Sequence, residues 1–283
     1  MEESITVPKT ILLTGLPRSG TTLVCNLLTS LPNVVALNEP MKVTELSDMT
    51  TEQQFAAINQ FVAENRYSLL KSGVAISKHI EGQIPDNTFR NNVSNEGLRV
   101  SLVEHGQIKL DKILTEDFVL AIKHNAAFAY LLNKLVLRYN CFGIIRNPLA
   151  VLWSWQTVNL NIHYGHIPVG EAFDADLRET LNKIESVFDR QLYILNWFFT
   201  KFDQNLPLEQ IIRYEHVINS NGRCLEVISP IANSIHASLK SLNKNPLYKQ
   251  EQFSIIADRL LKSEGTYWKY YSREDVIGLL SGK

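Results

Sequence analysis

Residues 9–22 read Lys-Thr-Ile-Leu-Leu-Thr-Gly-Leu-Pro-Arg-Ser-Gly-Thr-Thr, an apolar run that passes through a Pro/Gly turn into two hydroxyl side chains. The first seven residues predict a buried strand, and the apolar spacing that follows Thr21 predicts a helix ending at Ser30. A strand, a tight loop and a helix in this order form a P-loop, whose backbone N–H groups and helix N-terminus hold phosphate oxygens. The segment therefore predicts an anion-binding loop in an α/β fold.

This loop differs from the loop of nucleotide triphosphatases at one important position. Triphosphatase loops follow GxxxxGK[ST], where the lysine contacts the β- and γ-phosphates and the hydroxyl contacts Mg²⁺. Here Thr21 stands at the lysine position, and the loop's cation is Arg18. A less charged group, held by one bidentate arginine and two hydroxyls, suits this loop better than a magnesium-bound triphosphate.

The chain beyond this loop alternates strands and helices. Four further short apolar runs that end in polar residues predict strands over 34–37, 118–122, 141–145 and 210–213. Periodic segments predict helices over 127–139, 149–158 and, as one long amphipathic helix, 177–202. This alternation predicts a central parallel sheet flanked by helices on both faces. Because ligands bind at the carboxyl ends of such strands, we expect the polar strand ends to meet in one crevice.

All 283 residues are expected to form a single domain, because no repeat, low-complexity tract or long flexible linker is visible. Two stretches fall outside the alternation. Residues 42–110 are polar and mostly helical by pattern, and the stretch of about 156–180 shows no clear period. We interpret both as insertions that form the acceptor pocket or a lid over the crevice, with mobile surface loops as the alternative.

The composition argues against several classes of protein. The 28 lysines and arginines nearly balance 29 aspartates and glutamates, so the basic footprint of a dedicated nucleic-acid binder is missing. The acidic start and a first apolar run of only three residues predict neither a signal peptide nor a membrane span. The three cysteines and seven histidines show no disulfide framework and no metal-ligand spacing. We expect a cytoplasmic protein without a metal, of an oligomeric state that the sequence does not indicate.

Four segments together resemble one enzyme family. The loop Pro17-Arg18-Ser19-Gly20-Thr21-Thr22 resembles the 5′-phosphosulfate loop of sulfotransferases that use 3′-phosphoadenosine 5′-phosphosulfate (PAPS). Residues 146–154 are similar to the family's 3′-phosphate segment, in which an arginine at a strand end, here Arg146, precedes a serine by eight residues, here Ser154. A serine two turns into a helix can face that strand end. Two shorter matches are Ile212-Arg213-Tyr214-Glu215 and Gly265-Thr266-Tyr267-Trp268-Lys269.

The resemblance implies a sulfotransferase fold and a metal-free, in-line transfer of a sulfuryl group from PAPS to a hydroxyl or amine of a small acceptor. The product would be 3′,5′-adenosine bisphosphate. The residues that the resemblance implies for holding the donor are Arg18, Ser19, Gly20, Thr21, Thr22, Arg146, Ser154, Tyr214 and, in place of a basic segment that this chain lacks, Lys269.

Two residues are candidates for the base that takes the acceptor proton. Glu39, in Asn38-Glu39-Pro40, looks like the Glu-bearing strand end of the tyrosylprotein, heparan and glycolipid branches of the family. His124, in Lys123-His124-Asn125, lies one residue before the histidine position of the cytosolic aryl and steroid branch. Strand alternation turns His124 away from the site if Lys123 points into it, so Glu39 is favoured. Arg18 and Lys123 are the cations expected at the leaving bridging oxygen.

Two other functions stay open: a P-loop kinase or nucleotide triphosphatase, and a non-catalytic nucleotide-binding protein of the same fold. The acceptor is not determined by these motifs, since fold does not fix substrate. We expect a bacterial natural product of secondary metabolism, for example a saxitoxin-type alkaloid, with a glycolipid or sugar alcohol as the alternative. The insertions contain carboxylates that could meet a cationic acceptor: Glu45, Asp48, Glu171, Asp174 and Asp176.

Overall fold

The computed structural model describes residues 9–94, 97–245, 248 and 250–280, and its centre is a parallel sheet. Its strands are β1 (Thr10–Gly15), β2 (Val34–Asn38), β7 (Val119–Lys123), β8 (Asn140–Ile145) and β9 (Ile211–Arg213). They run in the order β2-β7-β1-β8-β9, and every neighbouring pair is parallel. The predicted strands and the α/β fold class are therefore confirmed.

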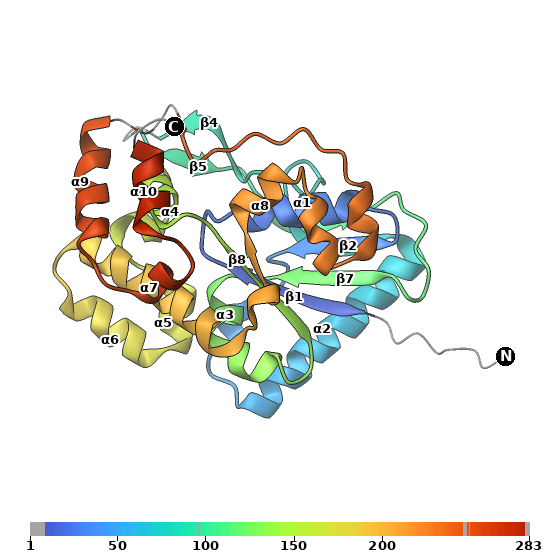
Figure 1. The fold of residues 1–283 in the computed structure, drawn as a ribbon. Coiled ribbons are helices and arrows are strands. Elements are labelled where there is room, and N and C mark those ends of the chain that lie inside the picture. The colour runs from blue at the N-terminus through green and yellow to red at the C-terminus, as the bar shows by residue number, and fades with distance from the viewer. Residues whose placement is uncertain (1–8, 95–96, 246–247, 249, 281–283) are drawn as a thin grey trace.

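Helices on both faces explain why the central strands are continuous apolar runs. Helix α1 (Thr21–Ser30) covers one face of the sheet, and helix α3 (Ala126–Leu135) covers the other (Figure 1). Strands β1, β2 and β8 are buried along almost their whole length, because neither face meets water. The parallel arrangement puts the polar residues that follow β1, β2, β7 and β8 at the same edge of the sheet.

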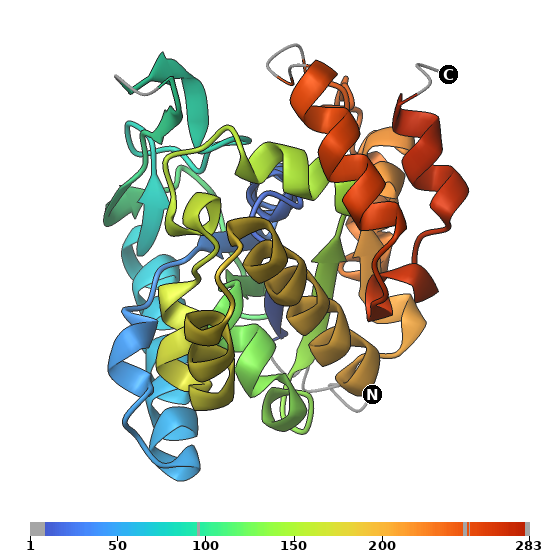
Figure 2. The same ribbon diagram turned by 90° about the vertical axis from the view of Figure 1, so that its left-hand side faces the viewer.

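The C-terminal part of the chain forms a helical cluster beside the sheet. Helix α4 (Pro148–Trp155) follows β8 and packs against α9 (Gln250–Leu261) and α10 (Arg273–Leu280), which lie side by side in Figure 2. Helix α8 (Tyr214–Asn219) follows β9 directly. Short 3₁₀ helices connect these elements over Leu208–Gln210, Arg223–Val227, Pro230–Ser234 and Thr266–Lys269.

The prediction of one helix over 177–202 is wrong. Two helices stand there, α6 (Ala175–Lys183) and α7 (Val187–Asn205), the second of which packs against α3. The chain becomes extended at Ile184, and the Ser186 hydroxyl accepts a hydrogen bond from the Asp189 N–H at 3.3 Å. A serine that caps a new helix start breaks the backbone helix while the apolar spacing continues across the break.

The stretch 42–110 is helical only in part, so the prediction that it is mostly helical is wrong. It contains a 3₁₀ turn (Val43–Leu46) and helix α2 (Thr51–Ser72), and then two antiparallel strand pairs. These pairs are β3 (Val74–His79) with β6 (Glu104–Lys109), and β4 (Phe89–Val93) with β5 (Arg99–Ser101). Strand β6 is polar and largely exposed, so it lacks the apolar alternation that identifies a strand.

The stretch 156–180 contains a 3₁₀ turn (Asn161–Tyr164), helix α5 (Pro168–Phe173) and the start of α6. Among the helices of the described ranges, none is both long and apolar enough to cross a membrane.

Candidate functional site

The loop between β1 and α1 has the wound backbone of an anion-binding loop. Arg18 and Gly20 both adopt left-handed conformations, with φ angles of 70° and 94°. The Ser19 hydroxyl donates to the Ile144 carbonyl at 2.9 Å and so fixes the loop to β8. Gly20, at the start of α1, provides no side-chain cap, which leaves the N–H groups of the first helical turn to a ligand.

A cavity of about 420 Å³ lies over this loop and the neighbouring strand ends. It brings together most of the residues predicted to hold the donor or to act in transfer. Those that line it are Arg18, Gly20, Thr21, Thr22, Glu39, Lys123, Arg146 and Tyr214. The expected convergence of polar strand ends is therefore present.

The cavity is strongly cationic around Arg18. The Arg18 guanidinium stacks on the Phe89 ring at 4.5 Å from its centroid and donates to Asn87 Oδ1 at 3.2 Å. Burial and the neighbouring guanidinium groups of Arg99 and Arg146 lower the pKa of Arg18 to about 9. Within the described part of the chain, no ion pair joins any of these three arginines to a carboxylate. Arg18 and Arg146 line the cavity, and two guanidinium groups that no carboxylate pairs with among the described residues fit an anionic ligand.

Arg146 follows β8, which β7 and β1 separate from β2 in the sheet, and it fastens a segment that borders the cavity. Its guanidinium donates to the Arg18 carbonyl at 2.9 Å, to Asn243 Oδ1 at 2.7 Å and to the Leu242 carbonyl at 2.7 Å. The Leu242 N–H in turn donates to the Tyr214 hydroxyl at 3.0 Å. The exposed Lys240 lies in this segment and lines the cavity. Sequence analysis missed Lys240, because no motif marks it.

Three predicted donor-binding residues do not line this cavity. Ser19 is occupied by its bond to β8, and Ser154 is buried in α4, where its hydroxyl accepts from Arg18 Nε at 3.1 Å. Lys269 pairs with Asp203 at 2.7 Å. The structure therefore does not bring Lys269 to the site. Ser154 contacts the site only indirectly, because it holds the Arg18 side chain.

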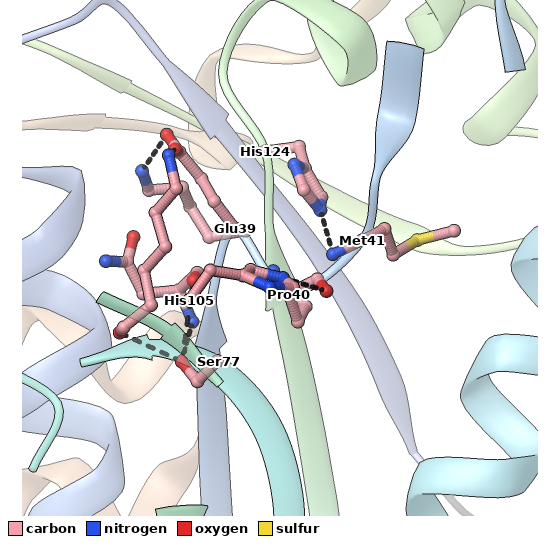
Figure 3. Close-up of polar contacts among 9 residues, drawn as sticks. Glu39, Pro40, Met41, Ser77, His105 and His124 are labelled. Carbon is pink, nitrogen blue, oxygen red and sulfur yellow. Dashed lines mark hydrogen bonds and ion pairs between the residues drawn. The ribbon is translucent and has the colours of Figure 1, made fainter. Parts of the chain in front are cut away.

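Glu39 follows β2 in a strained conformation and lies between two lysines (Figure 3). Its φ angle is 46°, a value that residues other than glycine rarely adopt. Strained backbone conformations of this kind cluster at functional sites. The carboxylate accepts from Lys123 Nζ at 2.8 Å and from Lys78 Nζ at 2.5 Å. Burial alone would raise the pKa of this carboxyl, but the two ammonium groups outweigh burial and hold the pKa well below its usual range.

Lys78 is a second residue that sequence analysis missed. It stands near the end of β3, in a stretch whose pattern predicted a helix. Recognition of β3 would have placed Lys78 near a strand end, which is the signal that identified the other candidates.

Two histidines hold the turn that carries Glu39 (Figure 3). His124 Nε2 accepts from the Met41 N–H at 3.1 Å, and His105 Nε2 donates to the Pro40 carbonyl at 2.8 Å. Burial lowers the pKa of His124 to about 3, so its ring stays neutral at physiological pH. His124 therefore has the properties of a neutral, fixed hydrogen-bond acceptor, whereas Glu39 is ionised and lines the cavity over the loop.

A second cavity, of about 570 Å³, adjoins the first. The two cavities share lining residues at their junction, namely Pro17, Glu39, Lys78, Asn125 and Leu160. The carboxylate and one of its lysines therefore stand where a group could pass from one cavity to the other.

Two buried side-chain oxygens of residues at the cavity wall have no hydrogen-bond partner within the described ranges of the chain. They are Asn38 Oδ1 and Asn125 Oδ1, and both residues line the first cavity. Orphaned buried acceptors are rare in native structures, so these two amides are unusual features of the cavity wall.

Comparison with known proteins gives a distant likeness to a solved structure. No protein-family profile and no curated protein matches the chain. Among solved structures, the chain is similar to the sulfotransferase STF1 from Mycobacterium tuberculosis H37Rv, at 15% identity and a TM-score of 0.30. The match covers 98% of this chain and 77% of that one. At this level the likeness carries no conclusion about the activity of this chain.

Proposed function

We propose that the protein is a sulfotransferase that moves a sulfuryl group from PAPS to a small acceptor without a metal ion. The observation that carries the proposal is the position of Glu39, whose carboxylate lines both the cavity over the anion-binding loop and the adjoining cavity. A base between a donor cavity and an acceptor cavity is the arrangement that in-line group transfer requires.

The residues of the first cavity suit a donor with a phosphosulfate at one end and a second phosphate at the other. The backbone of the loop, Thr21, Thr22 and Arg18 would hold the phosphosulfate. Arg146, which follows β8 and not the strand of Glu39, and Lys240, in the segment that Arg146 fastens, would attract the 3′-phosphate. Tyr214 borders the same region and would contact the nucleoside. PAPS supplies the sulfuryl group when bound.

A magnesium-dependent kinase or triphosphatase is supported less well by the same cavity. Thr21 replaces the lysine that contacts the β- and γ-phosphates. Among the described residues that line this cavity, the carboxylates are Glu39, which two lysines already hold, and Asp86. This donor set suits an anionic ligand without Mg²⁺ better than a metal-bound triphosphate.

Glu39 must gain basicity before it can accept a proton, because two ammonium groups stabilise its charge. Lys123 lies beside the anion-binding loop, with its strand β7 paired to β1. When the Lys123 ammonium turns from Glu39 toward the bridging oxygen of the donor, the pKa of the carboxyl rises toward its usual range. The same movement would bring the ammonium beside the leaving oxygen and stabilise the negative charge that forms there. One lysine would then both free the base and assist the leaving group.

Calorimetric titration tests the nucleotide part of the proposal. The purified chain is titrated with 3′,5′-adenosine bisphosphate, with and without magnesium, and with ATP plus magnesium. We expect binding of the bisphosphate that magnesium does not change and that is about tenfold tighter, or more, than binding of ATP. A preference for ATP with magnesium, or no binding of the bisphosphate, would overturn the proposal in favour of a different phosphate ligand.

A further inference from the structure

The second cavity has walls of a different chemistry from the first. Apolar side chains from the turn after β2, the 3₁₀ turn at 161–164 and helix α5 form much of its lining, among them Met41, Val43, Ile162, Ile167, Pro168 and Val169. Its volume of about 570 Å³ falls in the range of pockets that hold a whole small molecule. An acceptor that fills this cavity must bury apolar surface to bind well.

The charged groups of this cavity are mostly cationic. Its cations are Lys42 and Lys78, and the imidazole rings of His105, His124 and His166, the second of them neutral, also line it. Glu39 is the one carboxylate among its described lining residues, and both of its oxygens already accept from lysine ammonium groups. A positively charged acceptor would therefore meet like charges and no available counter-ion.

The carboxylates expected to meet a cationic acceptor lie elsewhere. Glu171 accepts from the Ile167 N–H at 2.6 Å and pairs with His166, which places it behind the lining residues. Asp174 accepts from Trp197 Nε1 at 2.9 Å and pairs with Lys201. Glu45, Asp48 and Asp176 do not line either cavity. The expectation of an alkaloid acceptor therefore finds no support in the charge of this cavity.

We infer that the acceptor is a mainly apolar alcohol or phenol that carries no positive charge, and that it binds in the cavity bounded by Met41, Ile162 and Val169. The inference rests on the proposed function. In the transfer, the acceptor oxygen forms a bond to sulfur, and the bond between sulfur and the bridging oxygen of PAPS breaks. The electron pair of that bond stays on the departing bisphosphate, and the acceptor proton passes to Glu39.

Matched pairs of acceptors test the charge preference. The purified protein is assayed with PAPS as donor. The acceptors are 4-ethylphenol and its ammonium analogue tyramine, hexan-1-ol and its ammonium analogue 6-aminohexan-1-ol, and the sugar alcohol sorbitol. The rate of acceptor-dependent bisphosphate release gives kcat/KM for each. We expect at least one uncharged member to exceed its ammonium partner by about tenfold or more, and sorbitol to be poor. Ammonium compounds that match or exceed their partners, or preference for sorbitol, would overturn the inference.

A substitution in the apolar wall tests whether this cavity is the acceptor site. Val169→Asp adds a carboxylate to the wall, and we expect it to shift the ratio of kcat/KM toward the ammonium member of each pair by about tenfold. Val187→Asp makes the same change at the exposed start of α7, outside both cavities, and should leave the ratio unchanged. An unchanged ratio in Val169→Asp would refute the placement of the acceptor.

Failure of the inference and failure of the proposed function give different results. If the bisphosphate binds as expected and no uncharged compound is turned over, the acceptor class is wrong while the nucleotide site stands. If the bisphosphate does not bind, the proposed function itself fails, and the acceptor inference fails with it.

Discussion

Arg18 Nε donates a hydrogen bond to Ser154 Oγ at 3.1 Å, although 136 residues separate the two along the chain. The bond joins the loop after β1 to helix α4. A second bond supports the same contact, since Trp155 Nε1 donates to the Pro17 carbonyl at 2.8 Å. The two segments that resemble the 5′- and 3′-phosphate elements are therefore in direct contact, and α4 fixes the cation of the loop.

Loss of the Ser154 hydroxyl should therefore affect the loop through Arg18. Ser154→Ala leaves a guanidinium N–H without its partner in a buried position, so we expect the free energy of unfolding to fall by about 1–2 kcal/mol. Affinity for 3′,5′-adenosine bisphosphate should fall by several-fold because Arg18 loses its fixed orientation. Urea unfolding and calorimetry measure the two effects. Ser47→Ala, at an exposed turn, is the matched control, and equal effects in both variants would contradict the role of Ser154.

Replacement of Glu39 tests the proposed base. Glu39→Gln keeps the shape of the side chain and removes its basicity, so we expect kcat to fall by roughly two to four orders of magnitude. Affinity for the bisphosphate should stay nearly unchanged, because the phosphate contacts come from other residues. Glu45→Gln, which lies outside both cavities, is the control. Turnover near the wild-type rate would eliminate Glu39 as the base.

Lys240 and Arg146 should matter for the 3′-phosphate in different ways. Lys240→Ala removes an exposed charge at the cavity wall, so we expect affinity for the bisphosphate to fall by about tenfold, with little effect on adenosine 5′-monophosphate. Arg146→Ala should weaken binding of the bisphosphate and also destabilise the fold, because Arg146 fastens residues 242–243. Lys183→Ala, at a distant exposed site, is the control for Lys240. Equal losses for the two nucleotides would disprove the 3′-phosphate assignment.

The position of Gly20 requires a glycine for two reasons: its backbone is left-handed, and a neighbouring ring leaves no space for a side chain. A Cβ atom at Gly20 would lie 2.6 Å from Tyr214 Cδ2, at a φ angle of 94°. We expect Gly20→Ala to reduce the free energy of unfolding by about 1–3 kcal/mol and to abolish binding of the bisphosphate. Gly278→Ala in α10, where the added methyl group meets no atom within 4 Å, should stabilise the chain slightly. Thermal unfolding compares the two, and a stable, nucleotide-binding Gly20→Ala protein would contradict this reading of the loop.

His124 should make stability depend on pH. Its folded pKa of about 3 lies below the ordinary histidine value of about 6.5, so below that value the unfolded chain takes up a proton that the native ring refuses. Wild-type stability should therefore fall with pH from about 6.5 downward, by up to about 1.4 kcal/mol per pH unit from this residue. His124→Gln keeps an acceptor for the Met41 N–H but does not titrate.

The two proteins are compared by urea unfolding at pH 7.5 and pH 5. We expect the variant to be less stable at pH 7.5 and the difference to narrow by about 2 kcal/mol at pH 5. His236→Gln, at an exposed position, should show no such change. A difference that is the same at both pH values would mean that the native ring takes up a proton at pH 5 as the unfolded chain does, which contradicts a lowered pKa of His124.

The central strands and the polar residues that follow them could be predicted from local patterns, and the breaks in helices could not. Buried parallel strands are continuous apolar runs, so β1, β7 and β8 were visible in the sequence. The division between α6 and α7 depends on Ser186, whose hydroxyl caps a new helix while the apolar spacing runs on. The polar strand β6 is held by its pairing with β3, a contact with no local signature.

The amino-acid sequence alone determined the α/β class, the anion-binding loop and the missing loop lysine, because apolar runs, Gly/Pro turns and helix starts are properties of neighbouring residues. Contacts between distant segments determined the rest. Lys78 reaches Glu39 across 39 residues, and Lys240 lines the cavity in a segment that Arg146 and Tyr214 hold at residues 242–243. Lys269, which the sequence motif suggested, pairs with Asp203 instead. Side chains meet according to the packing of whole elements, which no local pattern contains.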